Sequence, residues 1–256
     1  MNQRRRLLRI RDHFQTHPEL TVDTACRLLK ASPATVRRDF NHLVEEGQAE
    51  KMWGGIGRPT SGPAAPLAYW VRETQALEAK RAIAHRASAL IKDGDVVMLD
   101  GGTTTFQLAG LLTERKVRII TNSLVIALEV SRRQYRKRGA EVLLAGGFLY
   151  PGADVAGGWH AEQNIRKYRA KWAFLSSSGI DRDGVTNNLE FVLGTEKAMI
   201  EQSDHVVIMA DAGKIGNRGM FEMCSWDEVD YLVTEAPGDS PILKGISSRK
   251  VKLLMA

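Results

Sequence analysis

From residue 95 to the C-terminus, short apolar runs alternate with longer amphipathic segments. The runs are DVVMLD (95–100), VRIIT (117–121), EVLLA (141–145), WAFLSS (172–177), HVVIMA (205–210), YLVT (231–234) and KVKLL (250–254). Segments compatible with helices lie between them, around 106–113, 123–133, 160–168 and 194–203. Near-continuous apolar strands separated by amphipathic helices are typical of a mainly parallel sheet that is covered on both faces. The sequence therefore predicts an α/β fold for this region.

The N-terminal region has a different pattern, with three short helices and no long apolar strand. Apolar residues at helical spacing predict a helix over 3–16 and a second helix that begins after Thr21 as its N-cap. Ser32 can cap a third helix with Pro33 at its first position, and Val36 and Phe40 would lie on its buried face. Helices in this order indicate a helix-turn-helix, whose last helix enters the major groove of DNA.

The outer face of the third helix carries the side chains that a DNA-reading helix needs. Guanidinium groups can donate to guanine or to phosphate, and hydroxyl or amide groups can bond neighbouring sites. The segment QAEKMWGGIG (48–57) that follows has the composition of a β-wing. The expected DNA contacts are Ser32, Ala34, Thr35, Arg37, Arg38, Asn41 and, on the wing, Lys51. The alternative is a solvated surface helix in which Arg37 and Arg38 pair with Asp39 or Glu45.

Charge along the chain agrees with a polyanionic partner for the N-terminal region. The formal net charge is +6, and residues 1–60 hold 11 Lys and Arg against 7 Asp and Glu, a balance of +4. The other 196 residues therefore carry only +2. A concentrated basic excess is the electrostatic footprint expected for double-stranded DNA, although a solvated basic face would also produce it.

Composition shifts divide the chain into parts. RPTSGPAAP (58–66) is rich in Pro, Gly, Ser and Ala and lacks periodicity, so it is interpreted as a linker. A long helix is expected over 72–92. We therefore expect a winged helix-turn-helix domain at 1–57, a linker at 58–71 and an α/β effector-sensing domain at 72–256.

Composition also limits where the protein acts and what it binds. No apolar run approaches the roughly 20 residues of a membrane span, and Arg9, Arg11 and Asp12 interrupt the apolar residues near the N-terminus. We therefore expect a cytoplasmic protein without a membrane partner. Its two cysteines, Cys26 and Cys224, are far apart and lack metal-ligand neighbours, so neither a disulfide nor a metal site is expected. No cofactor is expected either.

The loop after the first predicted strand, LDGGTTTFQL, has the features of an anion site. Gly101 and Gly102 allow close backbone approach, Thr103, Thr104 and Thr105 offer hydroxyl groups, and a helix would start near Phe106. A phosphate fits these features, although the motif is neither a Walker A nor a Rossmann fingerprint. A purely structural turn with capping threonines is the alternative.

Other strand ends carry similar residues, and ligands in such folds collect at the carboxyl ends of the strands. TNS (121–123), AGG (145–147), SSSGID (176–181) and ADAGK (210–214) are small, glycine-rich or able to hydrogen-bond. Lys214 can neutralise a phosphate, and Asp211 can hold sugar hydroxyls or orient Lys214. Lys214 as a solvated surface lysine is the alternative.

Two sets of motifs together resemble one family, the DeoR-type transcriptional regulators. SPATVRRDFNHLVEEGQAEKMWGG is similar to their winged helix-turn-helix signature, and LDGGTTTFQLAGLL, ITNSL, LLAGG, AFLSSSGID, GVT and MADAGKIG are similar to their sensor domain. The resemblance covers nearly all of residues 4–235. It implies a sensor domain that resembles ribose-5-phosphate isomerases and coenzyme A transferases in fold and binds phosphorylated sugars or related intermediates.

The resemblance also implies a set of ligand-binding residues. Gly102, Thr103 and Thr104 would hold the phosphate, with Asn122, Gly147 and Lys214 nearby. Including the residues argued above, the expected effector site is Asp100, Gly101, Gly102, Thr103, Thr104, Thr105, Asn122, Gly147, Glu196, Asp211 and Lys214. Thr234-Glu235 and NNLEFVLGTEKAM (187–199) depart from the family pattern. The second departure leaves open whether Glu190 or Glu196 faces the ligand.

The function expected from these features is transcriptional regulation. We expect a repressor of a carbohydrate-use operon, controlled by a phosphorylated sugar and acting on operator DNA as a homodimer or homotetramer, because one helix-turn-helix reads too few base pairs. The alternative is a sugar-phosphate isomerase with an appended DNA-binding domain. Asp181, Glu190, Glu196 and Lys214 supply the residue types for that reaction, but Asp181 stands alone where the isomerases use paired acids.

Overall fold

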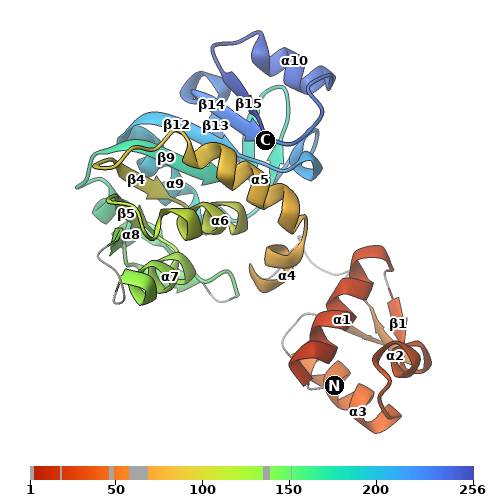
Figure 1. Ribbon diagram of the computed structural model, residues 1–256. Coiled ribbons are helices and arrows are strands. Elements are labelled where there is room, and N and C mark those ends of the chain that lie inside the picture. Colours follow the sequence, from red (N-terminus) through yellow and green to blue (C-terminus); the bar gives the residue numbers. More distant parts are fainter. Residues whose placement is uncertain (1–2, 18, 46–48, 58–68, 135–138, 151) are drawn as a thin grey trace. The chain divides into compact units, whose positions relative to one another are not determined.

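The computed structural model describes residues 3–17, 19–45, 49–57, 69–134, 139–150 and 152–256 (Figure 1). The chain forms two compact units, residues 1–71 and 72–256. Residues 58–68 of the linker expected at 58–71 lie outside the described residues, whereas 69–71 already belong to a helix. Among the helices of the described ranges, none has the length and apolar character needed to cross a membrane.

The N-terminal unit is a winged helix-turn-helix. Its elements are α1 (Gln3–Thr16), β1 (Glu19–Thr21), α2 (Val22–Leu29), α3 (Pro33–Glu45), β2 (Glu50–Met52) and β3 (Gly55–Gly57). The strands form an antiparallel sheet in the order β1-β3-β2. Thr21 caps α2 by accepting a hydrogen bond from the Thr24 N–H, and Lys30 ends this helix in the left-handed conformation. The predicted starts of all three helices are therefore confirmed.

The second unit is built on a seven-stranded parallel sheet. The strand order is β15-β14-β12-β9-β4-β5-β6. The strands are β4 (Val96–Leu99), β5 (Arg118–Thr121), β6 (Glu141–Leu144), β9 (Ala170–Ser176), β12 (Ser203–Met209), β14 (Tyr231–Thr234) and β15 (Lys252–Met255). Each of these strands corresponds to one of the seven predicted apolar runs, so the mainly parallel α/β fold is confirmed.

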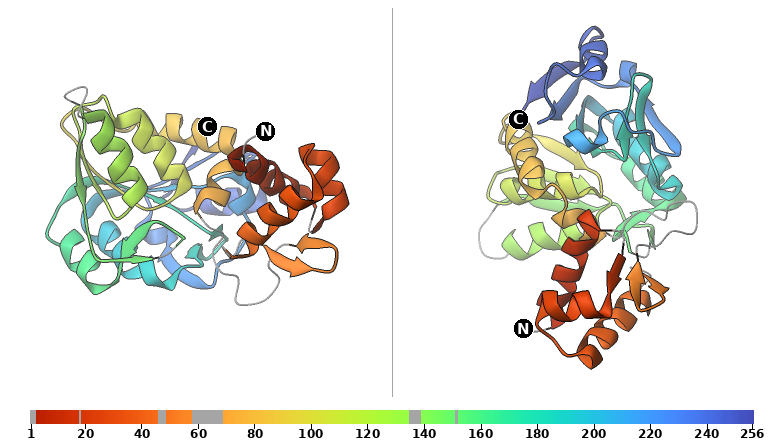
Figure 2. Two further views of the ribbon diagram at one scale, coloured as in Figure 1. Left: turned by 90° about the horizontal axis from the view of Figure 1, so that it is seen from below. Right: turned by 90° about the vertical axis from the view of Figure 1, so that its right-hand side faces the viewer.

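Helices cover both faces of this sheet, which explains why its strands lack polar alternation. On one face lie α5 (Leu77–Ser88), α6 (Thr103–Leu112) and α7 (Leu124–Gln134). On the other face lie α8 (Gly158–Ile165), α9 (Glu190–Glu201) and α10 (Pro241–Ser247). Successive strand residues point to opposite faces, so Val97 and Leu99 join the first core while Met98 joins the second. Figure 2 shows the sheet and the helices that cover it from two further directions.

Two small antiparallel sheets extend the second unit. One pairs β7 (Phe148–Tyr150) with β8 (Val155–Gly157), and the other has the order β10-β11-β13. Its strands are β10 (Gly179–Ile180), β11 (Gly184–Asn187) and β13 (Phe221–Ser225). The sequence did not predict either sheet.

Helix boundaries differ from the predictions at two places that matter for the site. The helix expected over 72–92 is broken into α4 (Tyr69–Thr74) and α5, because Ala76 adopts the left-handed conformation with φ 48°. The helix expected near Phe106 begins three residues earlier at Thr103, with Gly102 as its N-cap. The three threonines therefore form the first turn of α6 and are not part of the preceding loop.

Candidate functional site

The outer face of α3 presents most of the expected DNA-contacting side chains to solvent. Ala34, Arg37, Arg38 and Asn41 are exposed, while Val36 and the apolar residues of the next turn are buried in the small core of this unit. Among the described residues neither Arg37 nor Arg38 forms an ion pair. Both guanidinium groups are thus available to bases or phosphates.

Ser32 and Thr35 take part in the start of α3. The Ser32 Oγ accepts a hydrogen bond from the Thr35 N–H at 3.3 Å and lies 2.9 Å from the Thr35 Oγ1. These two hydroxyl groups therefore cap the helix while remaining at its accessible end.

Asp39, which the sequence offered as a partner for Arg37 or Arg38, is turned inward instead. Its side chain is 1% exposed and accepts hydrogen bonds from Arg6 Nε at 2.6 Å and Arg6 Nη2 at 3.0 Å. Asp39 lies on the same helix face as Val36 and Leu43, and this spacing is the signal that could have predicted its burial. The ion pair fixes α1 against α3.

The wing is the β2–β3 hairpin. Lys51 is exposed on β2, and Trp53 at the hairpin tip is fully exposed, followed by Gly54 with φ +79°. The ammonium group of Lys51 is accessible to a phosphate, as expected for a wing beside a recognition helix.

In the second unit, Asp100 joins the ends of two neighbouring strands. One carboxylate oxygen accepts from the Thr105 Oγ1 at 2.7 Å and from the Gly102 N–H at 3.1 Å. The other accepts from the Ser176 N–H and the Ser176 Oγ, both at 2.7 Å. Both Asp100 and Thr105 are buried, and their hydrogen bonds hold the loop between β4 and α6 in place.

The glycines of this loop are required by close contacts. A Cβ at Gly102 would lie 2.1 Å from the Ser176 Oγ, and one at Gly101 would lie 1.9 Å from the Val155 Cγ1. The same Gly101 position is 3.9 Å from the Asn122 Oδ1, so the loop after β5 approaches the loop after β4. The sequence suggested that Gly101 and Gly102 are needed for close approach to a ligand. The structure shows that packing also requires glycine at both positions.

The first turn of α6 provides donors without protein acceptors. Among the described residues, the N–H groups of Thr103, Thr104 and Thr105 meet no acceptor, since the first bond at this end joins the Phe106 N–H to the Gly102 carbonyl. Thr103 and Thr104 are buried. A helix N-terminus with these donors favours an anion through the hydrogen bonds and the helix dipole together.

Two buried polar atoms beside the loop also have no partner among the described residues: Asn122 Oδ1 and Glu196 Oε2. Asn122 donates its amide to the Ala156 carbonyl at 3.0 Å, and Glu196 accepts from the Asn187 Nδ2 at 2.8 Å. Unsatisfied buried polar atoms are uncommon and often mark a functional site. Asn122 Oδ1 and Glu196 Oε2 could each form a hydrogen bond with a hydroxyl group of a ligand.

The environment of Glu196 decides its charge. Burial, together with the negative charge of Asp100, raises the pKa of the Glu196 carboxyl to about 8. The Glu196 carboxyl is therefore mostly protonated at neutral pH, and in this form it can donate a hydrogen bond. Glu190, the other acid left open by the sequence, is exposed at the start of α9.

The loop after β12 brings positive charge to the same edge of the sheet. Asp211 is buried, and its carboxylate accepts from the Gly213 N–H at 3.0 Å instead of contacting Lys214. Lys214 is half-buried. Lys80 of α5, which the sequence did not single out, is buried and interacts electrostatically with both residues.

The structure explains Gly147 by packing. It has φ +110°, and a Cβ there would lie 2.7 Å from the Gly157 carbonyl oxygen and 2.9 Å from the Ala161 Cβ. These contacts account for the glycine without a ligand, and the place of Gly147 in an effector site remains a prediction.

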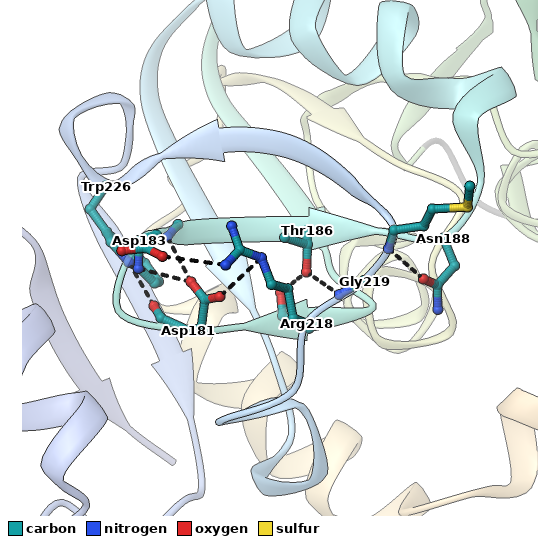
Figure 3. A network of polar contacts seen from close by, with 10 residues as sticks. Asp181, Asp183, Thr186, Asn188, Arg218, Gly219 and Trp226 are labelled. Atoms are coloured by element: carbon teal, nitrogen blue, oxygen red, sulfur yellow. Dashed lines mark hydrogen bonds and ion pairs between the residues drawn. The ribbon is translucent and has the colours of Figure 1, made fainter.

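Asp181 belongs to a separate polar network on the β10–β11–β13 sheet (Figure 3). Its carboxylate accepts from the N–H groups of Asp183 at 2.8 Å and Gly184 at 3.1 Å and lies 3.5 Å from Arg218 Nε. The Trp226 Nε1 donates to the Asp181 carbonyl at 3.0 Å. These bonds assign Asp181 to the turn between β10 and β11.

Comparison with known domain families matches both units. Residues 6–62 match the DeoR-like helix-turn-helix domain, and residues 75–236 match the DeoR C terminal sensor domain. The two matches cover the α3 surface and the strand ends described above.

Similar regulators share most of the chain. The HTH-type transcriptional repressor GlcR of Bacillus subtilis is 30% identical over 100% of this chain and 97% of its own length. The glycerol-3-phosphate regulon repressor of Escherichia coli is 31% identical over 87% of this chain and 86% of its own length. The uncharacterized HTH-type transcriptional regulator YulB of Bacillus subtilis is 31% identical over 91% and 89%.

Among solved structures, ribose 5-phosphate isomerase A from Neisseria gonorrhoeae aligns with a TM-score of 0.40 and 13% identity over 54% of this chain and 53% of that chain. The family is established by the sequence matches alone. With a winged helix-turn-helix that presents Arg37 and Arg38 and a matched sensor domain, the chain belongs to the DeoR family of DNA-binding transcriptional regulators.

Proposed function

We propose that this regulator is a repressor of a carbohydrate-use operon and that a phosphorylated sugar controls it. One observation carries the proposal: the Asp100 loop holds the first turn of α6 with three N–H donors that meet no protein acceptor among the described residues. A phosphate group matches this set of donors in charge and in hydrogen-bonding capacity.

The neighbouring side chains suit the rest of such a ligand. Lys214 supplies a positive charge near the same edge, while Asn122 Oδ1 offers an acceptor and the protonated Glu196 a donor for sugar hydroxyls. In this arrangement Asp100, Gly102 and Thr105 organise the loop, whereas Thr103 and Thr104 contact the phosphate. The name of the Escherichia coli relative, the glycerol-3-phosphate regulon repressor, agrees with a phosphorylated effector.

The proposed mechanism is linkage between effector and DNA. An effector that binds one arrangement of the sensor domains more tightly shifts the regulator towards that arrangement, in which the recognition helices no longer match the operator. A coupling of about 1–3 kcal/mol changes DNA affinity by roughly 5–150-fold. A homodimer or homotetramer is part of this proposal, because symmetry doubles the number of base pairs read. Because the proposed partner is operator DNA, we place the protein in the cytoplasm.

Catalysis is not part of the proposal. An isomerase needs a carboxylate base, but the Asp181 carboxylate is held by two backbone N–H groups and lies near Arg218, and Glu190 is exposed at the start of α9. Steady turnover of ribose 5-phosphate that Glu196→Gln abolishes would establish the isomerase instead.

The test is fluorescence anisotropy with labelled DNA from upstream of the protein's own operon, at fixed salt, with a panel of sugar phosphates and the matching free sugars. We expect one phosphorylated sugar to lower the affinity at least about 5-fold while its free sugar has no effect. If specific DNA binding occurs but no compound changes it, the effector class is wrong. If no specific DNA binding occurs, the repressor proposal fails.

A further inference from the structure

Strand β6 is an edge of the seven-stranded sheet, and its outer side carries unused backbone groups. Among the described residues β6 pairs with β5 alone. The Ala145 N–H, just after β6, donates to the Thr121 carbonyl of β5 at 2.8 Å. Alternate residues of a strand direct their backbone groups to opposite sides, so Val142 and Leu144 direct theirs away from the sheet. Such an edge can pair with a further strand.

Large apolar side chains surround this edge. The Leu124 N–H at the start of α7 donates to the Asp154 carbonyl just before β8 at 3.0 Å, and the Asn164 Nδ2 of α8 donates to the Ala145 carbonyl at 2.8 Å. Figure 1 shows α7 and α8 near β5, at the end of the sheet away from β15. The exposed apolar side chains of these elements form what we call the edge patch: Leu124, Leu128, Leu144, Phe148, Leu149 and Trp159.

The size of the edge patch is that of an interaction surface. Phe148 and Trp159 are each 68% exposed, which leaves roughly 200–340 Å² of aromatic surface in water. The leucines of the patch, 41–47% exposed, add to this area. One side of a stable homodimer interface buries about 800 Å², of which about 65% is apolar. The edge patch therefore approaches the apolar area that one half of a dimer interface needs.

The opposite edge of the same sheet has a different character. Lys252 lies on β15 and Lys250 precedes this strand, and both are exposed. Exposed lysines on an edge strand disfavour pairing with another strand. Strand β6 has no lysine, and its one charged residue, Glu141, pairs with Arg118 at 2.8 Å. The comparison indicates that β6, and not β15, meets a partner.

A second copy of the chain fits the β6 edge without any charge conflict. Two copies of one strand related by a twofold axis run antiparallel. With the axis at Leu143, Val142 of one copy lies opposite Leu144 of the other, and the outward N–H and C=O groups of these residues pair across the axis. Glu141 then lies opposite Ala145, so no two like charges face each other.

We propose that β6 and the edge patch form the interface between two copies of this chain, with their β6 strands paired antiparallel about an axis at Leu143. The two parallel sheets then become one continuous sheet, and contact with the second copy covers Phe148 and Trp159. The inference rests on the proposed function only in naming the surface of the homodimer included there. It needs neither the effector nor a particular operator.

The first experiment measures the oligomeric state of the full-length protein by sedimentation velocity. Leu144→Lys places a charge on the proposed interface. Met255→Lys is the matched control, because Met255 lies on the other edge strand and is 43% exposed against 42% for Leu144. We expect the wild type and Met255→Lys to dimerise equally and Leu144→Lys to dimerise at least 10-fold more weakly, with the circular dichroism of all three proteins unchanged.

The second experiment uses a substitution that leaves the interface apolar. Residues opposite each other in a non-hydrogen-bonded antiparallel pair have Cα atoms about 4.5 Å apart, which is within disulfide range. Leu143 would form such a pair with itself, whereas two copies of the exposed Glu141 would lie about 13 Å apart along the strands. In a Cys26→Ser background, mild oxidation should give at least 10-fold more covalent dimer with Leu143→Cys than with Glu141→Cys. Cys224 is buried and stays unchanged.

The outcomes separate this inference from the proposed function. If the wild type is a monomer, the inference is wrong, and specific operator binding by that monomer would leave the repressor proposal standing without its dimer. If the wild type is an oligomer but Leu144→Lys assembles equally well and Leu143→Cys does not cross-link above the control, the interface lies elsewhere and the inference alone fails. If Leu143→Cys cross-links but the protein binds no DNA specifically, the interface stands and the repressor proposal fails.

Discussion

Arg6 and Asp39 form a two-point ion pair, Nε to Oδ2 at 2.6 Å and Nη2 to Oδ1 at 3.0 Å, that joins the first helix of the DNA-binding unit to its recognition helix. The Asp39 side chain is 1% exposed and that of Arg6 is 14% exposed. The carboxylate raises the pKa of the arginine through the hydrogen bond. The pair fixes how α3 lies against α1, although Asp39 is not on the exposed face of α3.

Removing this carboxylate should weaken the unit more than it affects any single DNA contact. We expect Asp39→Ala to lower the free energy of unfolding by about 3 kcal/mol, because it removes the buried carboxylate that binds the partly buried Arg6. Hydrogen–deuterium exchange of peptides from α1 and α3 would measure the loss. Asp23→Ala, an exposed acid on α2, is the control; equal exchange in both variants would contradict a stabilising role for the pair.

Arg38 should contribute directly to operator binding. We expect Arg38→Ala to weaken specific binding by at least about 1 kcal/mol at fixed salt, since the exposed guanidinium group can reach a base or a phosphate. Fluorescence anisotropy with operator DNA measures the change. Lys116→Ala, an exposed cation of the sensor unit, should bind as the wild type does. Unchanged affinity in Arg38→Ala would remove this residue from the interface.

Asp100 should be necessary for the shape of the effector loop. Asp100→Asn replaces one acceptor oxygen by an NH2 group, which would oppose donors from Ser176 or from Thr105 and Gly102. We expect a loss of about 2 kcal/mol in the stability of the second unit and no response to effector. Chemical unfolding and anisotropy measure the two effects. DNA binding without effector should persist, and its loss would indicate wider damage.

Thr103 tests the phosphate contact more locally. Thr103→Glu places a negative charge at the first turn of α6 and should abolish the response of DNA binding to effector, because like charges repel. Thr103→Ser keeps the hydroxyl and should respond normally. Both variants should bind operator DNA in the absence of effector. Joint loss of DNA binding and response in Thr103→Glu would mean that this turn is structural.

Glu196 should make the stability of the second unit depend on pH. Its pKa is about 8 in the folded protein against 4.5 in the unfolded chain, so between these values the folded state binds one more proton. The free energy of unfolding should therefore fall by a few kcal/mol as pH rises from 4.5 to 8. Above pH 8, Glu196 should cause no further change. Urea unfolding across this range, compared with Glu196→Gln, measures the effect. Parallel curves for the two proteins would show that Glu196 ionises normally.

The sequence predicted the large sheet well because of how its strands are buried. A strand covered on both faces, such as β9 with Phe174 and Leu175, needs apolar residues at every position, and such runs are visible without knowledge of the fold. The starts of α2 and α3 were also predictable, since Thr21 and Ser32 cap helices through residues three positions away.

Features that depend on distant parts of the chain were missed. Lys80 resembles a solvated lysine in the sequence, and only the stripe that it shares with Ile83 and Ala87 indicates burial. The role of Asp100 depends on Ser176, 76 positions later. The break between α4 and α5 arises because Ala76 adopts the left-handed conformation. Glycine or asparagine usually occupies such a position, so an alanine gives no sign of the break in the sequence.

The fully exposed Trp53 at the tip of the wing has an optical consequence. An indole in water emits at longer wavelength than one packed in a protein core, as Trp172 and Trp226 are. If the wing docks against a nucleic acid, emission from Trp53 should be quenched by the bases, and Trp53→Phe would identify its share of the signal. In that case Trp53 would be a built-in reporter through which operator binding and release can be timed without any added dye.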